Sequence, residues 1–91
     1  MGKNLSMSHF VYIVQCSDDT LYTGYSVDVD KRIEVHNSGK GAKYTRSRLP
    51  VKLVYWKEFE TKSEALKWEY KIKQLSRKKK LKLCHNVRRY K

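Results

Sequence analysis

Acidic residues are scarce in this chain, and the scarcity is greatest toward its C-terminal end. Nine aspartates and glutamates stand against 21 lysines and arginines, which gives a formal net charge of +12 over 91 residues. No acidic residue occurs from Tyr70 to Lys91. Simple solubility does not require charge that is clustered in this way. The pattern favours binding to a polyanion, with nucleic acid first and an anionic membrane surface second.

Long apolar runs and cysteine motifs are also absent. No apolar run approaches the ~20 residues that span a membrane, and no signal peptide is recognisable. The two cysteines, Cys16 and Cys84, lie far apart and lack the spacing of metal ligands. Free thiols and a cytoplasmic location are therefore expected. A membrane-surface peptide is disfavoured, because no amphipathic helix rich in large apolar residues is present.

Internal repeats and linkers are missing too, which favours one small domain. The composition is 40% hydrophobic and 12% aromatic, which is typical of a chain that folds. We expect a flexible tail over residues 1–8, a folded domain over residues 9–84 and a basic tail over residues 85–91. A monomer is expected.

The apolar pattern predicts two strands, a helix, a third strand and two helices. The strands are expected over residues 9–16, 21–26 and 51–60. The helices are expected over residues 28–37, from residue 61 onward, and from residue 76 to about residue 84. Asp28 is a suitable N-cap for the first helix, Gly39 is a plausible stop, and Thr61 with Glu64 forms a capping box.

The register of the first hairpin decides whether Tyr12 and Tyr22 can act together. Successive side chains of a strand point to opposite faces of the sheet. The two tyrosines share a face only if the numbers of cross-strand partners sum to an even number, as in a pairing of Tyr12 with Ser26. That pairing needs an odd number of loop residues, for instance residues 18–20. A slip of one residue would separate the tyrosines.

The helix expected after this hairpin carries Arg32 and His36 one turn apart. Its apolar stripe contains Val29 and Ile33. We expect the side chains of Arg32 and His36 to lie along the edge of the helix face that packs on the sheet.

Residues 39–50 are predicted to form a long connection in which basic side chains surround Tyr44. Cations that contact phosphates, beside a ring that stacks on a base, suit a nucleic-acid strand. A solvated loop is the alternative interpretation. The residues expected to bind nucleic acid here and in the last two helices are Lys43, Arg46, Arg48, Lys73 and Arg77.

Glu69 lies on the apolar stripe of the helix that begins near Thr61, between Ala65 and Ile72. An unpaired buried charge is costly, so this carboxylate needs a cation, a metal ion or strong hydrogen-bond donors. An ordinary ion pair with Lys73 or with Arg32 would satisfy it. A metal ion would do so as well.

Taken in order, these residues resemble the GIY-YIG endonuclease superfamily, and more narrowly its small stand-alone bacterial members. The resemblance covers about residues 10–82 and depends on the ordered set rather than on one short motif. The first motif reads Phe-Val-Tyr instead of Gly-Ile-Tyr, and the second reads Tyr-Thr-Gly, so both tyrosines and the glycine are kept. The set consists of Val11-Tyr12, Tyr22-Thr23-Gly24, Arg32, His36 and Glu69.

The resemblance implies an α+β fold with a three-stranded antiparallel sheet flanked by helices, in the order ββαβαα. It also implies a metal-dependent phosphodiesterase that leaves a 5′-phosphate and a 3′-hydroxyl, acting on DNA in preference to RNA, in repair or processing. Glu69 would ligate one divalent ion, Mg²⁺ or alternatively Mn²⁺. Arg32 would contact the phosphate. Gly24 would have a structural role, because it lets backbone or substrate approach closely beside Tyr22.

Two candidates remain for the general base, namely Tyr12 supported by Tyr22, and His36. A free phenol has a pKa of about 10, so about one tyrosine in a thousand is ionised at pH 7, a gap of about 4 kcal/mol. Neighbouring cations could close much of it. His36 titrates nearer neutrality. The sequence also leaves open a second class of function, a basic nucleic-acid-binding module that keeps the nuclease fold without catalysis.

Overall fold

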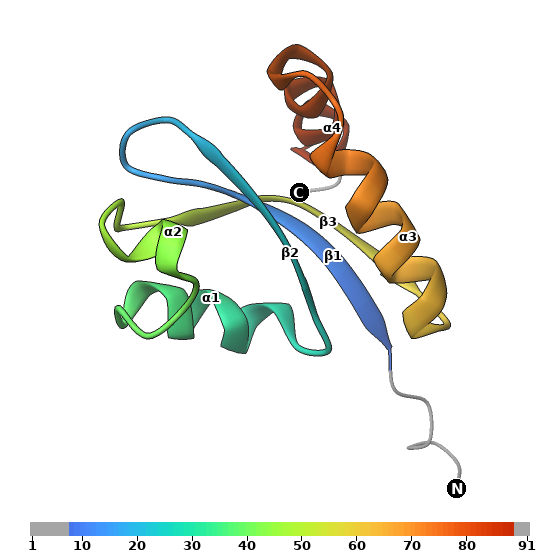
Figure 1. Cartoon of the computed structure of the whole chain (residues 1–91), viewed down its shortest axis with the longest axis horizontal. Helices are drawn as coiled ribbons and strands as arrows, with labels where there is room; N and C mark the ends of the chain where they lie inside the picture. The colour runs from blue at the N-terminus through green and yellow to red at the C-terminus, as the bar shows by residue number, and fades with distance from the viewer. Residues whose placement is uncertain (1–7, 89–91) are drawn as a thin grey trace, which may run out of the picture.

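The chain forms an antiparallel sheet with helices on both faces (Figure 1). The structure is a computed structural model that describes residues 8–88. Apart from one short extra helix, α2, the elements follow the predicted order ββαβαα, and the predicted α+β fold is confirmed. The elements are β1 His9–Gln15, β2 Leu21–Ser26, α1 Val29–Asn37, α2 Lys43–Arg46, β3 Lys52–Phe59, α3 Lys62–Lys73 and α4 Arg77–Arg88.

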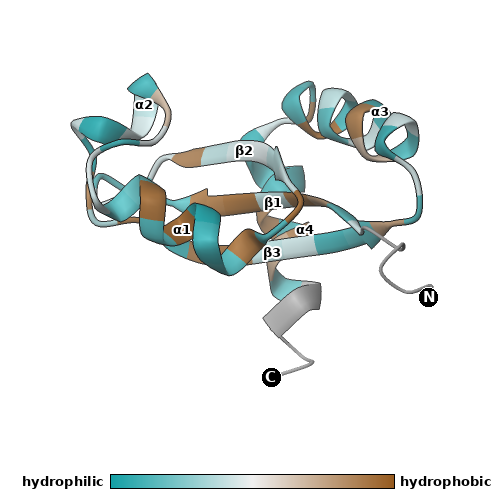
Figure 2. Ribbon diagram, turned by 90° about the horizontal axis from the view of Figure 1, so that it is seen from below, coloured by the Kyte–Doolittle hydropathy of each residue, from teal (hydrophilic) through white to brown (hydrophobic). Residues whose placement is uncertain are grey.

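The central strand of the sheet is β1. The strand order is β2-β1-β3, with both pairs antiparallel, and the four residues 11–14 are buried. Figure 2 accordingly shows β1 as hydrophobic over most of its length. On one face Val14 packs in a cluster with Val29 of α1, and on the other Ile13 packs with Ala65 of α3. Within residues 8–88, β2 has a neighbouring strand on one side only, so it is an edge strand of the sheet.

The register of the first hairpin places Tyr12 and Tyr22 on the same face of the sheet. Tyr12 pairs with Gly24 and Val14 pairs with Tyr22, so the partner numbers sum to an even number, as the shared face requires. The register differs by two residues from the pairing of Tyr12 with Ser26. Residues 16–20 form the loop, an odd number, which the Cys16 N–H closes by donating to the Thr20 carbonyl at 2.8 Å.

The predicted starts of two helices are confirmed by their caps. The Asp28 side chain accepts from the backbone N–H of Lys31, and the Thr61 hydroxyl accepts from that of Glu64, each at 3.1 Å. Gly39, with φ at +84°, follows the end of α1 in the left-handed conformation that glycine adopts readily.

The helix α2 interrupts the connection that the sequence predicted to be irregular. It has four residues, fewer than the window of about 11 over which helical periodicity can be recognised. Its Thr45 side chain is fully buried against α1, so tertiary contact rather than local pattern forms this turn.

The ends of the chain differ in part from the predicted limits. The helix α4 extends to Arg88, beyond the end predicted near Cys84. The predicted N-terminal tail, apart from Ser8, and the end of the predicted basic tail from residue 89 lie outside the described residues. Among the described helices, none combines the length and apolar character that crossing a membrane requires.

Candidate active site

Several conspicuous residues of the sequence come together beside Gly24 of β2. The Tyr12 side chain crosses over Gly24, where a Cβ atom would lie 2.4 Å from the phenolic oxygen. Its hydroxyl contacts His36 Nε2 at 2.9 Å, and the Arg32 side chain lies beside the same hydroxyl. Glu69, from the opposite face of the sheet, is near enough to influence the Tyr12 phenol electrostatically. Gly24 therefore leaves the space that the end of the Tyr12 side chain occupies over β2.

The imidazole of His36 is held at both nitrogens inside the protein. The side chain is 0% exposed, with Nε2 on Tyr12 and Nδ1 at 2.9 Å from the Thr45 hydroxyl. That hydroxyl has a single hydrogen, which it donates to the carbonyl of Ala42 at 2.9 Å. We therefore assign the proton of His36 to Nδ1, where it is donated to Thr45. Nε2 is then an acceptor, and the Tyr12 hydroxyl donates to it.

The environment keeps both members of this pair neutral at neutral pH. Burial raises the pKa of Tyr12 above its ordinary value of 10.0. Arg32 opposes that rise, whereas Tyr22 and the negative charge of Glu69 add to it. Burial, with a smaller contribution from Arg32, lowers the pKa of His36 below 6.5. Tyr12 is thus a protonated donor, and His36 is a neutral acceptor.

A second glycine, Gly41, lies directly against the His36 ring. Gly41→Ala is expected to lower the free energy of unfolding by about 1–3 kcal/mol, the usual cost of overpacking. The new methyl group would lie 2.4 Å from His36 Nδ1 and 2.8 Å from its Cα, and backbone atoms cannot swing away. Urea denaturation measures the loss.

The matched control for this prediction is Gly39→Asn. Gly39 has nothing within 4 Å, so the only cost of this change is the backbone strain of its positive φ, which asparagine keeps to at most about 1 kcal/mol. Equal losses in the two variants would contradict the close contact between Gly41 and His36.

Tyr22 lies between the His36 pair and α2. Its ring centre is 5.6 Å from that of His36, in an edge-on arrangement. On the α2 side it stacks with Tyr44, with ring centres 5.9 Å apart and planes 20° from parallel. The Tyr44 ring, which was expected to stack on a nucleic-acid base, therefore already stacks on Tyr22 within the protein.

Glu69 is mostly buried and paired. Its side chain is 17% exposed, and Oε2 lies 3.2 Å from Nζ of Lys73, which is 54% exposed. This is one of the two ion pairs that the sequence allowed. Within residues 8–88, no three histidines, cysteines or acidic side chains come together as a ready-made metal cluster. A single carboxylate nevertheless fits Mg²⁺, which keeps several waters and binds substrate phosphates.

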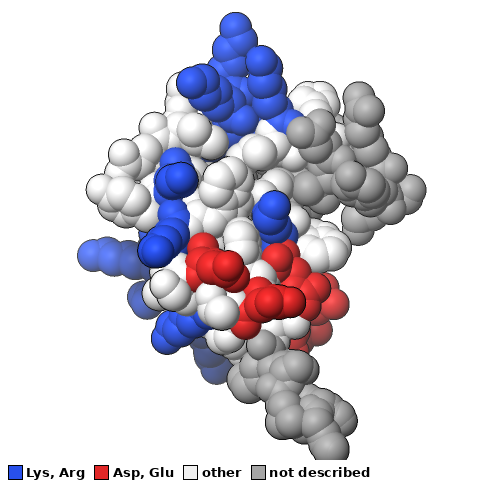
Figure 3. Space-filling model, turned by 90° about the vertical axis from the view of Figure 1, so that its right-hand side faces the viewer, with Lys and Arg blue, Asp and Glu red and all other residues white. Residues whose placement is uncertain are grey.

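The residues predicted to bind nucleic acid come from α2, from the segment after it, from the end of α3 and from the start of α4. Lys43 and Arg46 are exposed on α2, Arg77 is exposed at the start of α4, and Lys73 contacts Glu69. Arg48 is engaged with Asp18 and with α2. On the face shown in Figure 3, acidic side chains gather in the middle, with basic ones around them and at the top.

Sequence reasoning missed Thr45 and Gly41. Thr45 sets the tautomer of His36, and Gly41 makes room for its ring. No local signal marks either residue, because a threonine or a glycine in a predicted loop is ordinary turn chemistry.

Comparison with known proteins agrees with this architecture. A family model described as the GIY-YIG catalytic domain matches residues 8–82. The chain therefore belongs to the GIY-YIG family, a nuclease superfamily that acts on nucleic acid and generally uses a divalent metal ion. The predicted resemblance is confirmed.

Small proteins named UPF0213 are similar to this chain over most of their length. Those of Staphylococcus aureus strains N315 and COL are 66% identical over 76 residues, which cover 84% of this chain and 93% of each relative. The solution structure of the UPF0213 protein BH0048 from Bacillus halodurans is 57% identical, with a TM-score of 0.55, and covers 85% of this chain and 82% of that one. For EF2693 from E. faecalis the values are 41%, 0.60, 89% and 86%.

Proposed function

We propose that this protein is a metal-dependent phosphodiesterase that hydrolyses DNA, in repair or processing. The observation that carries the proposal is the Tyr12 hydroxyl, which donates to a neutral His36 beside Arg32. Phosphodiester hydrolysis needs a base that takes a proton from water and a cation that stabilises the charge on the phosphate. Tyr12 with its proton acceptor His36 would supply the base, and Arg32 would supply the cation.

The geometry supports a proton relay rather than a choice between two bases. The attacking water would give its proton to the Tyr12 oxygen as the Tyr12 proton moves to Nε2 of His36, 2.9 Å away. Thr45 would hold the imidazole in the required tautomer. Tyr12 would then not have to ionise before the water attacks. The free-energy cost of about 4 kcal/mol for ionising a phenol at pH 7 is therefore not a separate barrier.

Arg32 and Glu69 would act on the phosphate. The planar guanidinium of Arg32 suits the non-bridging oxygens better than an ammonium group would. A divalent ion, Mg²⁺ or Mn²⁺, held by Glu69 would supply Lewis-acid stabilisation of the charge that develops on the phosphate and the leaving oxygen. Lys73 would have to release the Glu69 carboxylate or share it, since the two now form an ion pair. Lys43, Arg46 and Arg77 are exposed and would contact the backbone of the strand.

Cleavage assays test the proposal directly. The purified chain is incubated with plasmid, branched and single-stranded DNA, and with RNA of matched sequence, in Mg²⁺, in Mn²⁺ and in chelator. We expect nicking of DNA that needs the metal ion and is lost in Arg32→Ala. The matched control is Lys31→Ala, an exposed cation on the same helix, which should cleave normally.

One pattern of results would favour the non-catalytic module instead. Binding of DNA without cleavage of any substrate, in either metal ion, would overturn the nuclease proposal. The Glu69–Lys73 ion pair favours this second candidate, because a carboxylate that already has a cation does not need a metal. Cleavage of RNA alone would correct the substrate and leave the chemistry in place.

A further inference from the structure

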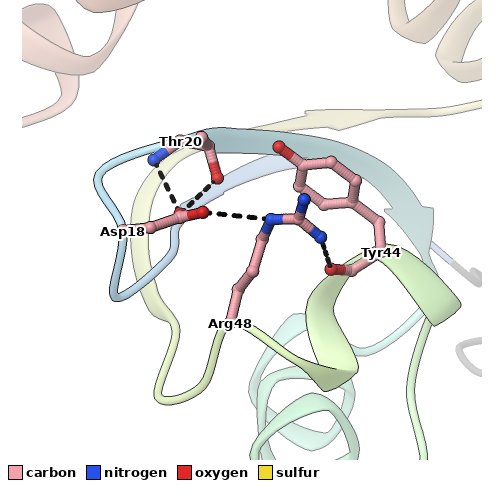
Figure 4. A network of polar contacts seen from close by, with 4 residues as sticks. All are labelled: Asp18, Thr20, Tyr44 and Arg48. Carbon is pink, nitrogen blue, oxygen red and sulfur yellow. Dashed lines mark hydrogen bonds and ion pairs between the residues drawn. The ribbon is translucent and has the colours of Figure 1, made fainter.

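Arg48 is held by three contacts within the protein. Its Nε lies 3.1 Å from Oδ2 of Asp18, one of its terminal nitrogens donates to the carbonyl of Tyr44 at 2.7 Å, and its guanidinium carbon lies 3.9 Å from the centre of the Tyr44 ring. Figure 4 shows the guanidinium between the Asp18 carboxylate and Tyr44. A cation with these partners is poorly placed to be a free ligand for phosphate.

These contacts join two segments that are distant in the sequence. Asp18 belongs to the loop between β1 and β2, whereas Tyr44 lies on α2. The backbone makes a second link at the same place, since the Ser17 N–H donates to the carbonyl of Arg48 at 2.9 Å. Asp18 itself is held by Thr20, whose N–H and hydroxyl donate to Oδ1 at 3.1 Å and 2.6 Å. Thr20 therefore fixes the orientation of the Asp18 carboxylate independently of Arg48.

The helix so anchored contacts the proposed proton relay at two points. The Tyr44 ring stacks on Tyr22, which in turn contacts the His36 ring. The next residue, Thr45, accepts a hydrogen bond from the N–H at Nδ1 of His36. Because α2 has only four residues and no side-chain cap, its place depends on contacts with other elements.

We propose that Asp18 and Arg48 are positioning residues, which hold α2 against the hairpin and so keep His36 oriented to accept the proton of Tyr12. This inference rests on the proposed nuclease function and replaces the expected role of Arg48 in binding nucleic acid. Neither residue touches the reacting atoms; both act through Tyr44 and Thr45.

Asp18→Asn separates the two roles of Arg48, because they predict opposite results. The change keeps the shape of the side chain and an oxygen for Thr20, but it removes the negative charge that pairs with Arg48. A positioning role predicts that kcat falls about 10- to 100-fold, as a small misplacement of a catalytic group does, while KM is unchanged or lower. A phosphate-ligand role predicts tighter DNA binding with kcat unchanged, since the cation is released, and that result would overturn the inference.

Two further variants sharpen the comparison. Arg48→Lys keeps a cation near Asp18 and Tyr44 and should recover part of the kcat that Arg48→Ala loses. Arg46→Ala, an exposed arginine of the same helix, should instead weaken binding and reduce the slope of log affinity against log salt by about 1. If Arg48→Ala shows that same loss of salt dependence with kcat intact, Arg48 is a ligand and the inference is wrong.

A readout that does not need activity keeps this test independent of the proposed function. Nitrogen NMR shifts of the His36 ring report which nitrogen carries the proton. We expect one well-defined tautomer, protonated at Nδ1, in the native chain and averaged shifts in Asp18→Asn. Identical ring shifts in the two proteins would contradict the positioning role even if no substrate is ever cleaved. If the native chain cleaves no substrate but the ring shifts differ between the two proteins, the nuclease proposal is wrong and the structural link between Asp18 and His36 remains.

Discussion

Glu69→Gln is expected to reduce metal-dependent cleavage by about 10³-fold, because a metal ion contributes several kcal/mol of transition-state stabilisation at 1.4 kcal/mol per factor of ten. The substitution keeps the size of the side chain and removes its charge. It also releases Lys73, whose Nζ lies 3.2 Å from Oε2, so DNA binding should be unchanged or tighter. Rates measured over a titration of Mg²⁺, beside binding measured in chelator, separate these two effects.

The control for this prediction lies on the same helix. Glu64 is an exposed carboxylate in the first turn of α3, so Glu64→Gln makes the same chemical change away from the site. It should cleave at the native rate. Full activity in Glu69→Gln would show that Glu69 does not hold the metal ion, and the ion pair with Lys73 would then be its only role.

Tyr12→Phe is expected to lower the rate of cleavage by about 10²- to 10⁴-fold, the usual contribution of a general acid or base. The ring stays in place, so its packing in the sheet is kept, but the relay to His36 loses its first member. The free energy of unfolding should fall by about 1–3 kcal/mol, because the buried Nε2 of His36 loses its hydrogen-bond partner. Rate and stability are measured on the same preparation.

A second tyrosine provides a matched comparison. The Tyr25 hydroxyl also bonds to a histidine, at 2.7 Å from His9 Nδ1, but β2 presents Tyr25 to the opposite face of the sheet. Because this pair is only partly buried, Tyr25→Phe should lower the free energy of unfolding by about 1 kcal/mol and leave cleavage unchanged. If both variants lose stability and neither loses activity, Tyr12 is a structural residue, and His36 would then need another proton donor.

Much of the fold could be predicted from the sequence because several strong local signals agree. Asp28 and Thr61 mark helix starts through their own side chains, and the structure contains both caps. The alternation of side chains along the first two strands showed that a shared face for Tyr12 and Tyr22 requires an even sum, and the observed pairing of Tyr12 with Gly24 meets that condition. Such signals act over a few residues, so a sequence displays them directly.

The parts of the candidate site that sequence reasoning missed depend on contacts between distant segments. Thr45 lies nine residues after His36, in a helix too short to show periodicity. Arg48 was expected to contact phosphate because it lies in a basic stretch, whereas its partner Asp18 precedes it by 30 residues. A cation in a sequence does not reveal whether its counter-ion belongs to the protein or to a ligand, since both satisfy the same charge.

The even-sum register of the first hairpin limits which insertions and deletions the domain tolerates. One residue gained or lost in the loop 16–20, unless a β-bulge absorbed it, would turn Tyr22 to the face occupied by α3. Such a chain could still pair its strands, cap its helices and fold, yet its candidate active site would lack Tyr22. Gains or losses of two residues would keep both. Loop length in related sequences should therefore change by even steps where cleavage is retained, and an odd step would mark a lineage that has kept the fold for another use.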